Sequence, residues 1–418
     1  MARTVGIGHQ DFKKIRMKNN FYVDKTKFIR EWWESDDEVT LITRPRRFGK
    51  TLTMSMTESF FSVKYAGRND LFEGLAIWED EYYRQIQGTW PVINLSFANV
   101  KEKDYRSTIL RICQLLTDEY NRNAFLLEGN LLTEEEKQQF RGISMDMPEV
   151  VATMALHKLS EYFYRYYGKK VIILLDEYDT PIQEAYLNGY WDEMTGFVRS
   201  MFNAAFKTNP YLERAIMTGI TRVGKESVFS DLNNLEVITT TSEKYEECFG
   251  FTQAEVSQAL SEYGLADTES RVKNWYDGFR FGSRKDIYNP WSIINYLDKR
   301  KFAAYWANTS SNSLVGKLIR EGSVNVKIVM EDLLNGKSLH TQIDEQMVFS
   351  QLNHNEYAIW SLLLAGGYLR VEKYVLDEES GKEEYELALT NKEVHIVFER
   401  LIQEWFARFT PSYNAFAV

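Results

Sequence analysis

The sequence predicts an α/β fold with a parallel sheet, and three stretches of the chain support this. Residues 39–43 are apolar and β-branched and lead into a basic turn, after which a helix-forming run begins. Residues 171–175 are five consecutive apolar residues, the pattern of a strand buried on both faces. Residues 91–97 form a further strand pattern that lies between these two along the chain. Helical stretches separate the strands, and this alternation is typical of parallel sheets.

The turn after the first strand has the chemistry of a phosphate-binding loop, or P-loop. Gly49 has no Cβ, so backbone N–H groups can approach a phosphate closely. Lys50 would place a positive charge near the β- and γ-phosphates, and the hydroxyl of Thr51 can bind Mg²⁺. The helix that begins here adds the positive end of its dipole.

The loop departs from the usual G-x-x-x-x-G-K-[ST] pattern at one place, because Arg44 stands where the first Gly is expected. The alternative interpretation is a basic turn ahead of an amphipathic helix. Tyr22 precedes the strand and is a candidate for stacking on adenine, with core packing of the adjacent helix as its alternative. The residues expected to contact the nucleotide are Tyr22, Arg46, Arg47, Phe48, Gly49, Lys50, Thr51 and Leu52.

An acidic pair, Asp176 and Glu177, follows the buried strand at the end where open α/β sheets place their ligands. We expect Asp176 to hold Mg²⁺ through water, together with Thr51. Glu177 would polarise the water that attacks the γ-phosphate. A solvated acidic turn is the alternative for this pair alone. Because the pair and the basic turn occur together and in this order, a P-loop ATPase is favoured.

A further strand pattern, residues 212–222, ends in polar side chains. The strand pattern at residues 91–97, between the P-loop strand and the acidic strand, and the Glu177 beside Asp176 fit the additional-strand class of P-loop ATPases. In this class the strand after the acidic strand commonly places a polar residue between the attacking water and the γ-phosphate. Thr221 and Arg222 are the first candidates and Thr218 the second, with capping of the strand end as the alternative. Arg222 could touch phosphate within its own chain or in a second copy of the chain. The expected catalytic residues are Lys50, Glu177, Thr221 and Arg222.

Composition narrows the class of protein. The chain has 418 residues, 44% of them hydrophobic, and a formal net charge of −10, which argues against a protein that coats nucleic acid. Cys113 and Cys248 lie far apart in apolar surroundings and are expected to be buried thiols, as in a reducing cytoplasm. The sequence shows no signal segment and no apolar run near the roughly 20 residues that span a membrane, so we expect a cytoplasmic protein.

The chain divides into three expected parts. Residues 1–240 would form the P-loop core with an N-terminal segment, and residues 241–340 a mainly helical lobe. Residues 341–418 would form a winged-helix-like module, because an apolar helix, two alternating strands and a long helix follow one another there. Such modules bind DNA in some proteins and other partners elsewhere. The acidic turn at residues 377–381 disfavours DNA contact through that tip.

Several stretches together resemble a bacterial family, the AAA-ATPase-like proteins. In chain order they are FYVDKTKFI, LITRPRRFGKTLTMSM, VIILLDEYDTPI, MTGITRV with FSDLNNL, NWYDGFRFG and YNPWSI. The family's loop normally lacks the first Gly, so Arg44 fits the resemblance. The resemblance implies the P-loop roles for Lys50 and Thr51 and the acidic roles for Asp176 and Glu177.

Members of this family usually continue into a C-terminal PD-(D/E)xK nuclease-like domain. This chain ends about where that domain would begin, and the Glu135-x-Lys137 pattern lies in a predicted helix instead of on paired strands. Nuclease activity is therefore not carried over from the resemblance.

The sequence thus predicts Mg²⁺-dependent ATP binding and slow hydrolysis by a regulatory module. Its expected partner is an effector, either a nuclease-like domain or a separate protein, and its oligomeric state is open. Two alternatives are a nucleotide-binding scaffold that does not hydrolyse ATP, and a DNA-binding protein that uses the winged-helix-like module. Glu177 favours hydrolysis, because a site that only binds nucleotide does not need it.

Overall fold

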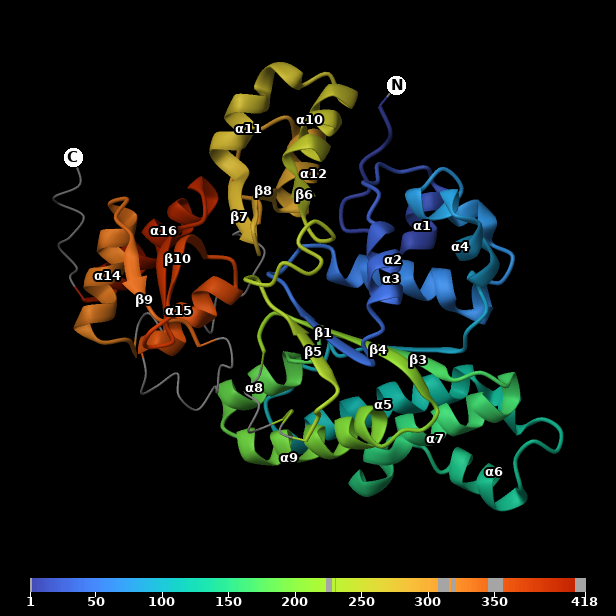
Figure 1. Cartoon of the computed structure of the whole chain (residues 1–418). Helices are drawn as coiled ribbons and strands as arrows, with labels where there is room; N and C mark the ends of the chain where they lie inside the picture. The colour runs from blue at the N-terminus through green and yellow to red at the C-terminus, as the bar shows by residue number, and fades with distance from the viewer. Residues whose placement is uncertain are drawn as a thin grey trace.

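A central parallel sheet organises the molecule (Figure 1). The computed structural model describes residues 2–222, 228–229, 231–306, 316, 321–344 and 356–409. The sheet order is β2-β3-β4-β1-β5. Its strands are β1 (Val39–Thr43), β2 (Val92–Ser96), β3 (Val171–Asp176), β4 (Leu212–Gly219) and β5 (Leu235–Ile238). The predicted α/β fold with a P-loop NTPase-like core is confirmed.

The inserted strand is β4, which pairs with both β1 and β3. The strand that follows the acidic pair along the chain therefore lies beside the P-loop strand. The strand predicted at residues 91–97 is present as β2, but it pairs with β3 at the edge of the sheet. The expectation that residues 91–97 supply the strand added between the P-loop strand and the acidic strand is therefore wrong, and β4 occupies that place. Order along the chain does not set order in the sheet, because parallel strands are joined by crossovers that can skip positions.

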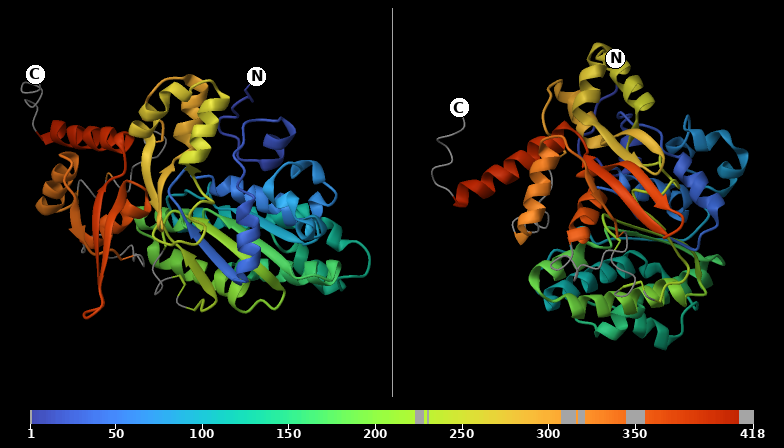
Figure 2. Two further views of the ribbon diagram at one scale, coloured as in Figure 1. Left: turned by 45° about the horizontal axis from the view of Figure 1, so that its top comes forward. Right: turned by 60° about the vertical axis from the view of Figure 1, so that its left-hand side comes forward.

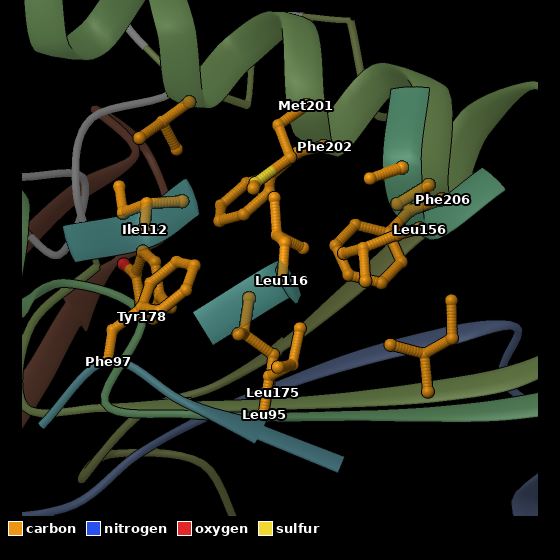
Figure 3. Close-up of a cluster of buried hydrophobic side chains, with 14 of the residues drawn as sticks. Leu95, Phe97, Ile112, Leu116, Leu156, Leu175, Tyr178, Met201, Phe202 and Phe206 are labelled. Atoms are coloured by element: carbon orange, nitrogen blue, oxygen red, sulfur yellow. The ribbon is translucent and has the colours of Figure 1, made fainter. Parts of the chain in front are cut away.

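Helices cover both faces of the sheet (Figure 1). On one face lie α5 (Tyr105–Arg122), α6 (Glu134–Arg141), α7 (Glu149–Tyr167), α8 (Thr180–Asn188) and α9 (Trp191–Phe202). On the other lie α1 (Phe12–Met17), α2 (Lys27–Ser35), α3 (Lys50–Phe61) and α4 (Glu81–Ile86). Along β3, Leu175 belongs to the core under α5–α9 (Figure 3). Ile173 belongs to the same core. Ile172 and Leu174 belong to the opposite core, so both faces of this strand are buried as its apolar run predicts.

The second lobe combines helices with a small antiparallel sheet in the order β6-β8-β7. It contains β6 (Phe251–Thr252), α10 (Gln253–Glu262), α11 (Glu269–Tyr276), β7 (Asp277–Phe281), β8 (Arg284–Tyr288) and α12 (Pro290–Lys299). Side chains cap the N-termini of two of its helices. Thr252 forms a capping box with Glu255 at the start of α10. The Asn289 side chain accepts hydrogen bonds from backbone N–H groups in the first turn of α12.

The C-terminal elements follow the predicted order of helix, hairpin and helix, with a third strand added (Figure 2). They are α14 (Val324–Leu334), β9 (Leu339–Thr341), α15 (Glu356–Ala365), β10 (Leu369–Asp377), β11 (Lys382–Leu389) and α16 (Lys392–Phe409). A single buried cluster joins Phe28 in α2, Phe279 in β7 and Phe398 in α16. The division into three domains stays a prediction, since this shared core crosses both proposed boundaries.

The sequence also makes predictions about the cysteines and about long apolar segments. Cys113 and Cys248 are buried free thiols, as expected. Among the described residues, no helix combines the length and apolar character that a membrane span requires.

Candidate active site

Four of the predicted site residues meet at the carboxyl edge of the central sheet: Lys50, Thr51, Asp176 and Glu177. The register places Ile42 of β1 opposite Thr218 of β4, and Leu175 of β3 opposite Met217. The polar residues that follow these positions therefore emerge at one edge, where open α/β sheets bind their ligands.

The phosphate loop begins where β1 ends and closes on α3. Gly49 has φ +86°, a left-handed conformation that favours glycine, and the helix starts at the next residue. Lys50 is 4% exposed, and its Nζ donates to the carbonyl oxygens of Arg44 (2.9 Å) and Pro45 (3.1 Å). The same Nζ lies 3.8 Å from Oε1 of Glu177. The ammonium thus lies inside the loop, next to the acidic pair.

Thr51 and Asp176 are joined directly, because the Thr51 hydroxyl donates to Oδ2 of Asp176 at 2.7 Å. Burial raises the pKa of Asp176, and the nearby Glu177 adds to that rise. Hydrogen bonds from Thr218 and Thr51 oppose it by stabilising the charged form. A buried carboxylate beside a threonine hydroxyl is an oxygen donor set that fits Mg²⁺, which binds through one or two carboxylates and keeps several waters.

Glu177 has an unusual backbone for a residue with a side chain, with φ +53°. Such a conformation costs roughly 1–3 kcal/mol and is held by its surroundings. The N–H of Glu177 donates to the Thr218 hydroxyl (3.3 Å), and the N–H of Tyr178 donates to the Thr218 carbonyl (2.9 Å). The Tyr178 hydroxyl reaches the carbonyl of Thr221 (2.7 Å). Hydrogen bonds therefore connect the acidic turn to the C-terminal end of β4 and the residues that follow it.

Asp179 is a site-supporting residue that the sequence did not single out. It is fully buried, and its Oδ2 accepts from the N–H groups of Ile220 (2.9 Å) and Thr221 (3.0 Å) and from the Thr221 hydroxyl (3.1 Å). Burial is the largest cause of its raised pKa. Thr221 thus faces Asp179, while Thr218 lies between Asp176 and Glu177.

Arg222 directly follows Thr221 in the chain, and the described cavities that it lines are not the one that Lys50 and Thr51 line. It lines a cavity of about 740 Å³ with Arg280 and Glu372, which lie in the second lobe and the C-terminal hairpin. The phosphate loop does not contribute to that cavity's described lining.

A groove of about 500 Å³ opens beside the phosphate loop. Its charged and polar lining includes Arg46, Arg47, Lys50, Thr51, Lys101, Glu177 and Gln183. An apolar cavity of about 110 Å³ adjoins it, and the two share His9, Gly49, Leu52, Pro290 and Ile294. Tyr22 and Phe48 line this apolar cavity, and the Tyr22 hydroxyl donates to Sδ of Met56 (3.2 Å). A polar groove that continues into an apolar cavity suits a ligand with a charged end and a flat apolar end.

The sequence of this chain is similar to a family of known proteins and to one individual relative. Residues 6–229 match the family model of the AAA-ATPase-like proteins, whose description is "Predicted AAA-ATPase". The chain belongs to this family. It is also 27% identical over 323 residues to an uncharacterized protein in the vnfD 5′ region of Azotobacter chroococcum mcd 1. That match covers 75% of this chain and 56% of the relative, so the chain spans little more than half of the relative's length.

Arg44, at the position of the missing glycine in this AAA-ATPase-like chain, turns away from the groove. Its guanidinium is fully buried over the rings of Phe281 (4.5 Å) and Phe249 (5.7 Å), and it donates to the carbonyl of Thr239. Burial lowers the pKa of Arg44 to about 10. The side chain thus attaches the loop to the second lobe.

The rest of the AAA-ATPase-like loop is held from outside by both lobes. The Phe48 ring packs on Phe279, with 4.8 Å between ring centroids. The carbonyl of Arg46 accepts from Nε1 of Trp306 (2.9 Å) and Nδ2 of Asn289 (3.2 Å). A Cβ on Gly367, in the turn before β10, would lie 2.8 Å from Cγ of Pro45. A movement of the loop would therefore change contacts with both the second lobe and the C-terminal elements.

Proposed function

We propose that this AAA-ATPase-like chain binds MgATP in the groove and hydrolyses it, and that the nucleotide state regulates what the C-terminal lobe contacts. One observation carries the proposal. The Thr51 hydroxyl lies 2.7 Å from Asp176, and Nζ of Lys50 lies 3.8 Å from Glu177, at the ligand-binding edge of the sheet. A metal-binding pair, a phosphate-binding cation and a base thus occur together.

Each residue has a distinct task in this proposal. Lys50 exchanges the loop carbonyls for oxygens of the β- and γ-phosphates, which are better partners for an ammonium. Thr51 and Asp176 would hold Mg²⁺, which when bound would neutralise charge that develops on the phosphates. Glu177 orients a water for attack on the γ-phosphate and accepts its proton. Thr218 fixes the backbone of Glu177 through the hydrogen bond at 3.3 Å.

The nucleotide base is assigned to the apolar cavity of about 110 Å³ beside Gly49. Tyr22 and Phe48 supply aromatic surface there, and purine bases stack well on such rings. The preference for adenine over guanine rests on the family description. Competition between ATP and GTP for the wild-type chain measures it, and equal affinities would contradict the preference.

Hydrolysis is favoured over a binding-only scaffold by the backbone of Glu177. A strained residue persists when its surroundings impose it, and such residues cluster at sites where the strain serves function. A scaffold would gain nothing from holding Glu177 in this conformation.

Thr221 and Arg222 have weaker support than Lys50 and Glu177. The hydroxyl of Thr221 is bound to Asp179, so we assign the polar position near the attacking water to Thr218 instead. An arginine contribution from Arg222 is proposed only across a contact between two copies of the chain. Mixing Arg222→Ala with Lys50→Ala protein would then restore hydrolysis, and a mixture as inactive as its parts would remove Arg222 from the site.

Calorimetric titration with MgATP tests the proposal. Lys50→Ala should weaken binding by about 1.5–3 kcal/mol, the scale of a hydrogen bond to a charged group. Unchanged affinity in a folded Lys50→Ala variant, or no binding by the wild-type chain, would contradict the proposal.

A further inference from the structure

Arg47 and Trp291 form a pair on the wall of the phosphate groove. The guanidinium carbon of Arg47 lies 4.4 Å from the centroid of the Trp291 ring, the geometry of a cation–π contact. Both residues line the groove that Lys50 and Thr51 also line. Arg47 is exposed, so a ligand in the groove has access to the pair.

The backbone fixes where the Arg47 side chain starts. Its φ is +65°, a left-handed conformation that an arginine adopts only under the constraint of its neighbours. The constraint is visible one residue earlier, where Nδ2 of Asn289 donates to the carbonyl of Arg46 (3.2 Å). Oδ1 of the same Asn289 accepts from the N–H of Trp291 (2.9 Å). One amide side chain thus holds the loop and the first turn of α12 together, which keeps Arg47 beside Trp291.

The contacts of Arg47 are weak compared with those of Lys50. In the part of the chain that the structure describes, no carboxylate lies within ion-pair distance of the Arg47 guanidinium, and its recorded partner is the indole ring. An exposed cation–π contact is weaker than two parallel charge-assisted hydrogen bonds from a guanidinium to a phosphate. A phosphate that enters the groove therefore competes successfully with Trp291 for this guanidinium.

The geometry points to an arginine with two positions. Before nucleotide binds, Arg47 rests on Trp291. When a nucleoside triphosphate occupies the groove, Arg47 leaves the ring and binds the β- or γ-phosphate, supplying in cis a second cation beside Lys50. Trp291 is then a positioning residue that stabilises the nucleotide-free state. This inference rests on the proposed function, since it assigns two further residues of the same site.

Titration of Arg47 variants with MgATP and with AMP tests the phosphate contact. Arg47→Ala should lose about 10- to 100-fold in affinity for MgATP, because charge-assisted hydrogen bonds are lost. Affinity for AMP should not change, since AMP lacks the β- and γ-phosphates. Arg47→Lys should recover only part of the loss, because an ammonium cannot form the paired bonds. The matched control is Arg271→Ala in α11. The guanidinium carbon of Arg271 lies 4.5 Å from the centroid of the Phe302 ring, so this variant also loses a cation–π contact. It should change neither the affinity for MgATP nor that for AMP.

The Trp291→Leu variant should change the affinity for MgATP in the opposite direction from Arg47→Ala. Removing the ring frees Arg47, so MgATP should bind about two- to fivefold more tightly, the equivalent of an exposed cation–π contact. In an Arg47→Ala background the same substitution should have no effect. A Trp291 that merely shapes the groove would weaken binding in both backgrounds, and that result would overturn the inference.

The remaining outcomes separate this inference from the proposed function. If the wild-type chain binds MgATP and Lys50→Ala loses binding while Arg47→Ala does not, the proposed function stands and the inference is overturned. If the wild-type chain binds no MgATP, both are overturned together.

Discussion

The hydroxyl of Thr51 donates a hydrogen bond of 2.7 Å to Oδ2 of Asp176, a residue 125 positions further along the chain. Asp176 ends β3, and Thr51 lies in the first turn of α3, which follows β1 through the phosphate loop. The parallel sheet brings the carboxyl ends of β1 and β3 to one edge. This contact joins the phosphate loop to the acidic turn. It also defines the position at which a divalent cation would be shared with a nucleotide.

Asp176→Asn should therefore abolish the dependence of ATP binding on Mg²⁺. The amide is a weaker ligand for a hard cation than a carboxylate, although it keeps the shape of the side chain. We expect affinity for ATP in the presence of EDTA to stay within about threefold of the wild-type value, since Lys50 is intact. Titrations with and without Mg²⁺ measure this, and an unchanged Mg²⁺ effect in Asp176→Asn would place the metal elsewhere.

Thr218→Val should reduce hydrolysis more than Thr221→Val. The Thr218 hydroxyl contacts both Asp176 and the backbone of Glu177, whereas that of Thr221 contacts Asp179. Both substitutions remove one buried hydroxyl of similar shape, so each serves as the control for the other. We expect kcat to fall roughly tenfold or more in Thr218→Val, which corresponds to about 1.4 kcal/mol. Equal kcat in the two variants would refute the assignment of Thr218.

Gly367→Ala tests whether the C-terminal lobe is coupled to the phosphate loop. Gly367 has φ +82°, and a Cβ there would meet Cγ of Pro45 at 2.8 Å. Gly381 has φ +66° with open space around it, so Gly381→Ala carries the backbone cost of about 1–2 kcal/mol without the clash. Only Gly367→Ala should also weaken MgATP binding, because only it displaces the loop. Identical ATP affinities in the two variants would show that the lobe and the loop are independent.

Glu393 should make stability depend on pH. It is buried at the start of α16, where the Ser292 hydroxyl (2.7 Å) and the Trp306 N–H (3.1 Å) donate to it. Burial raises its pKa from 4.5 to about 7. The folded state therefore holds this proton more tightly than the unfolded state, and stability falls as pH rises from about 4.5 to about 7. The loss is of the order of 3 kcal/mol at 1.36 kcal/mol per pKa unit.

Denaturant unfolding at pH 5 and pH 8 measures that effect. Glu393→Gln does not titrate, so its loss of stability between the two pH values should be smaller than that of the wild-type chain by about the same amount. An equal loss in both proteins would show that Glu393 does not titrate in this range.

The carboxyl edge of the sheet could be predicted from the sequence because it depends on local patterns. An apolar strand followed by Gly49-Lys50-Thr51, and another followed by Asp176-Glu177, are visible without any knowledge of the fold. The edge position of β2 could not be predicted in this way, because a strand pattern does not state its neighbours.

The choice between Thr218 and Thr221 depended on where β4 ends. The strand pattern extends over residues 212–222, but the strand stops at Gly219. Thr218 is therefore still in the sheet and beside Asp176, while Thr221 has turned towards Asp179. Strand boundaries are the least reliable part of a pattern, and here a difference of three residues changes the role.

The burial of Arg44 could not be predicted from the sequence, because it depends on contacts with distant residues. Its partners, Phe249 and Phe281, lie far away along the chain, and the sequence around an aromatic residue does not show which cation packs on its ring. The adjacent pair of Arg46 and Arg47 looks equivalent in sequence. In the structure the carbonyl of Arg46 anchors the loop, and the side chain of Arg47 faces Trp291.

Single-turnover hydrolysis of radiolabelled ATP by the wild-type chain and by Glu177→Gln tests the central claim most directly. The amide keeps the shape of Glu177 but cannot accept the proton of the attacking water. We predict that Glu177→Gln binds MgATP as tightly as the wild-type chain and that its hydrolysis rate falls by about 10²–10⁴-fold, the usual contribution of a general base. Hydrolysis at the wild-type rate in Glu177→Gln, with MgATP still bound, would contradict the assignment of this site as an ATPase centre built on Glu177.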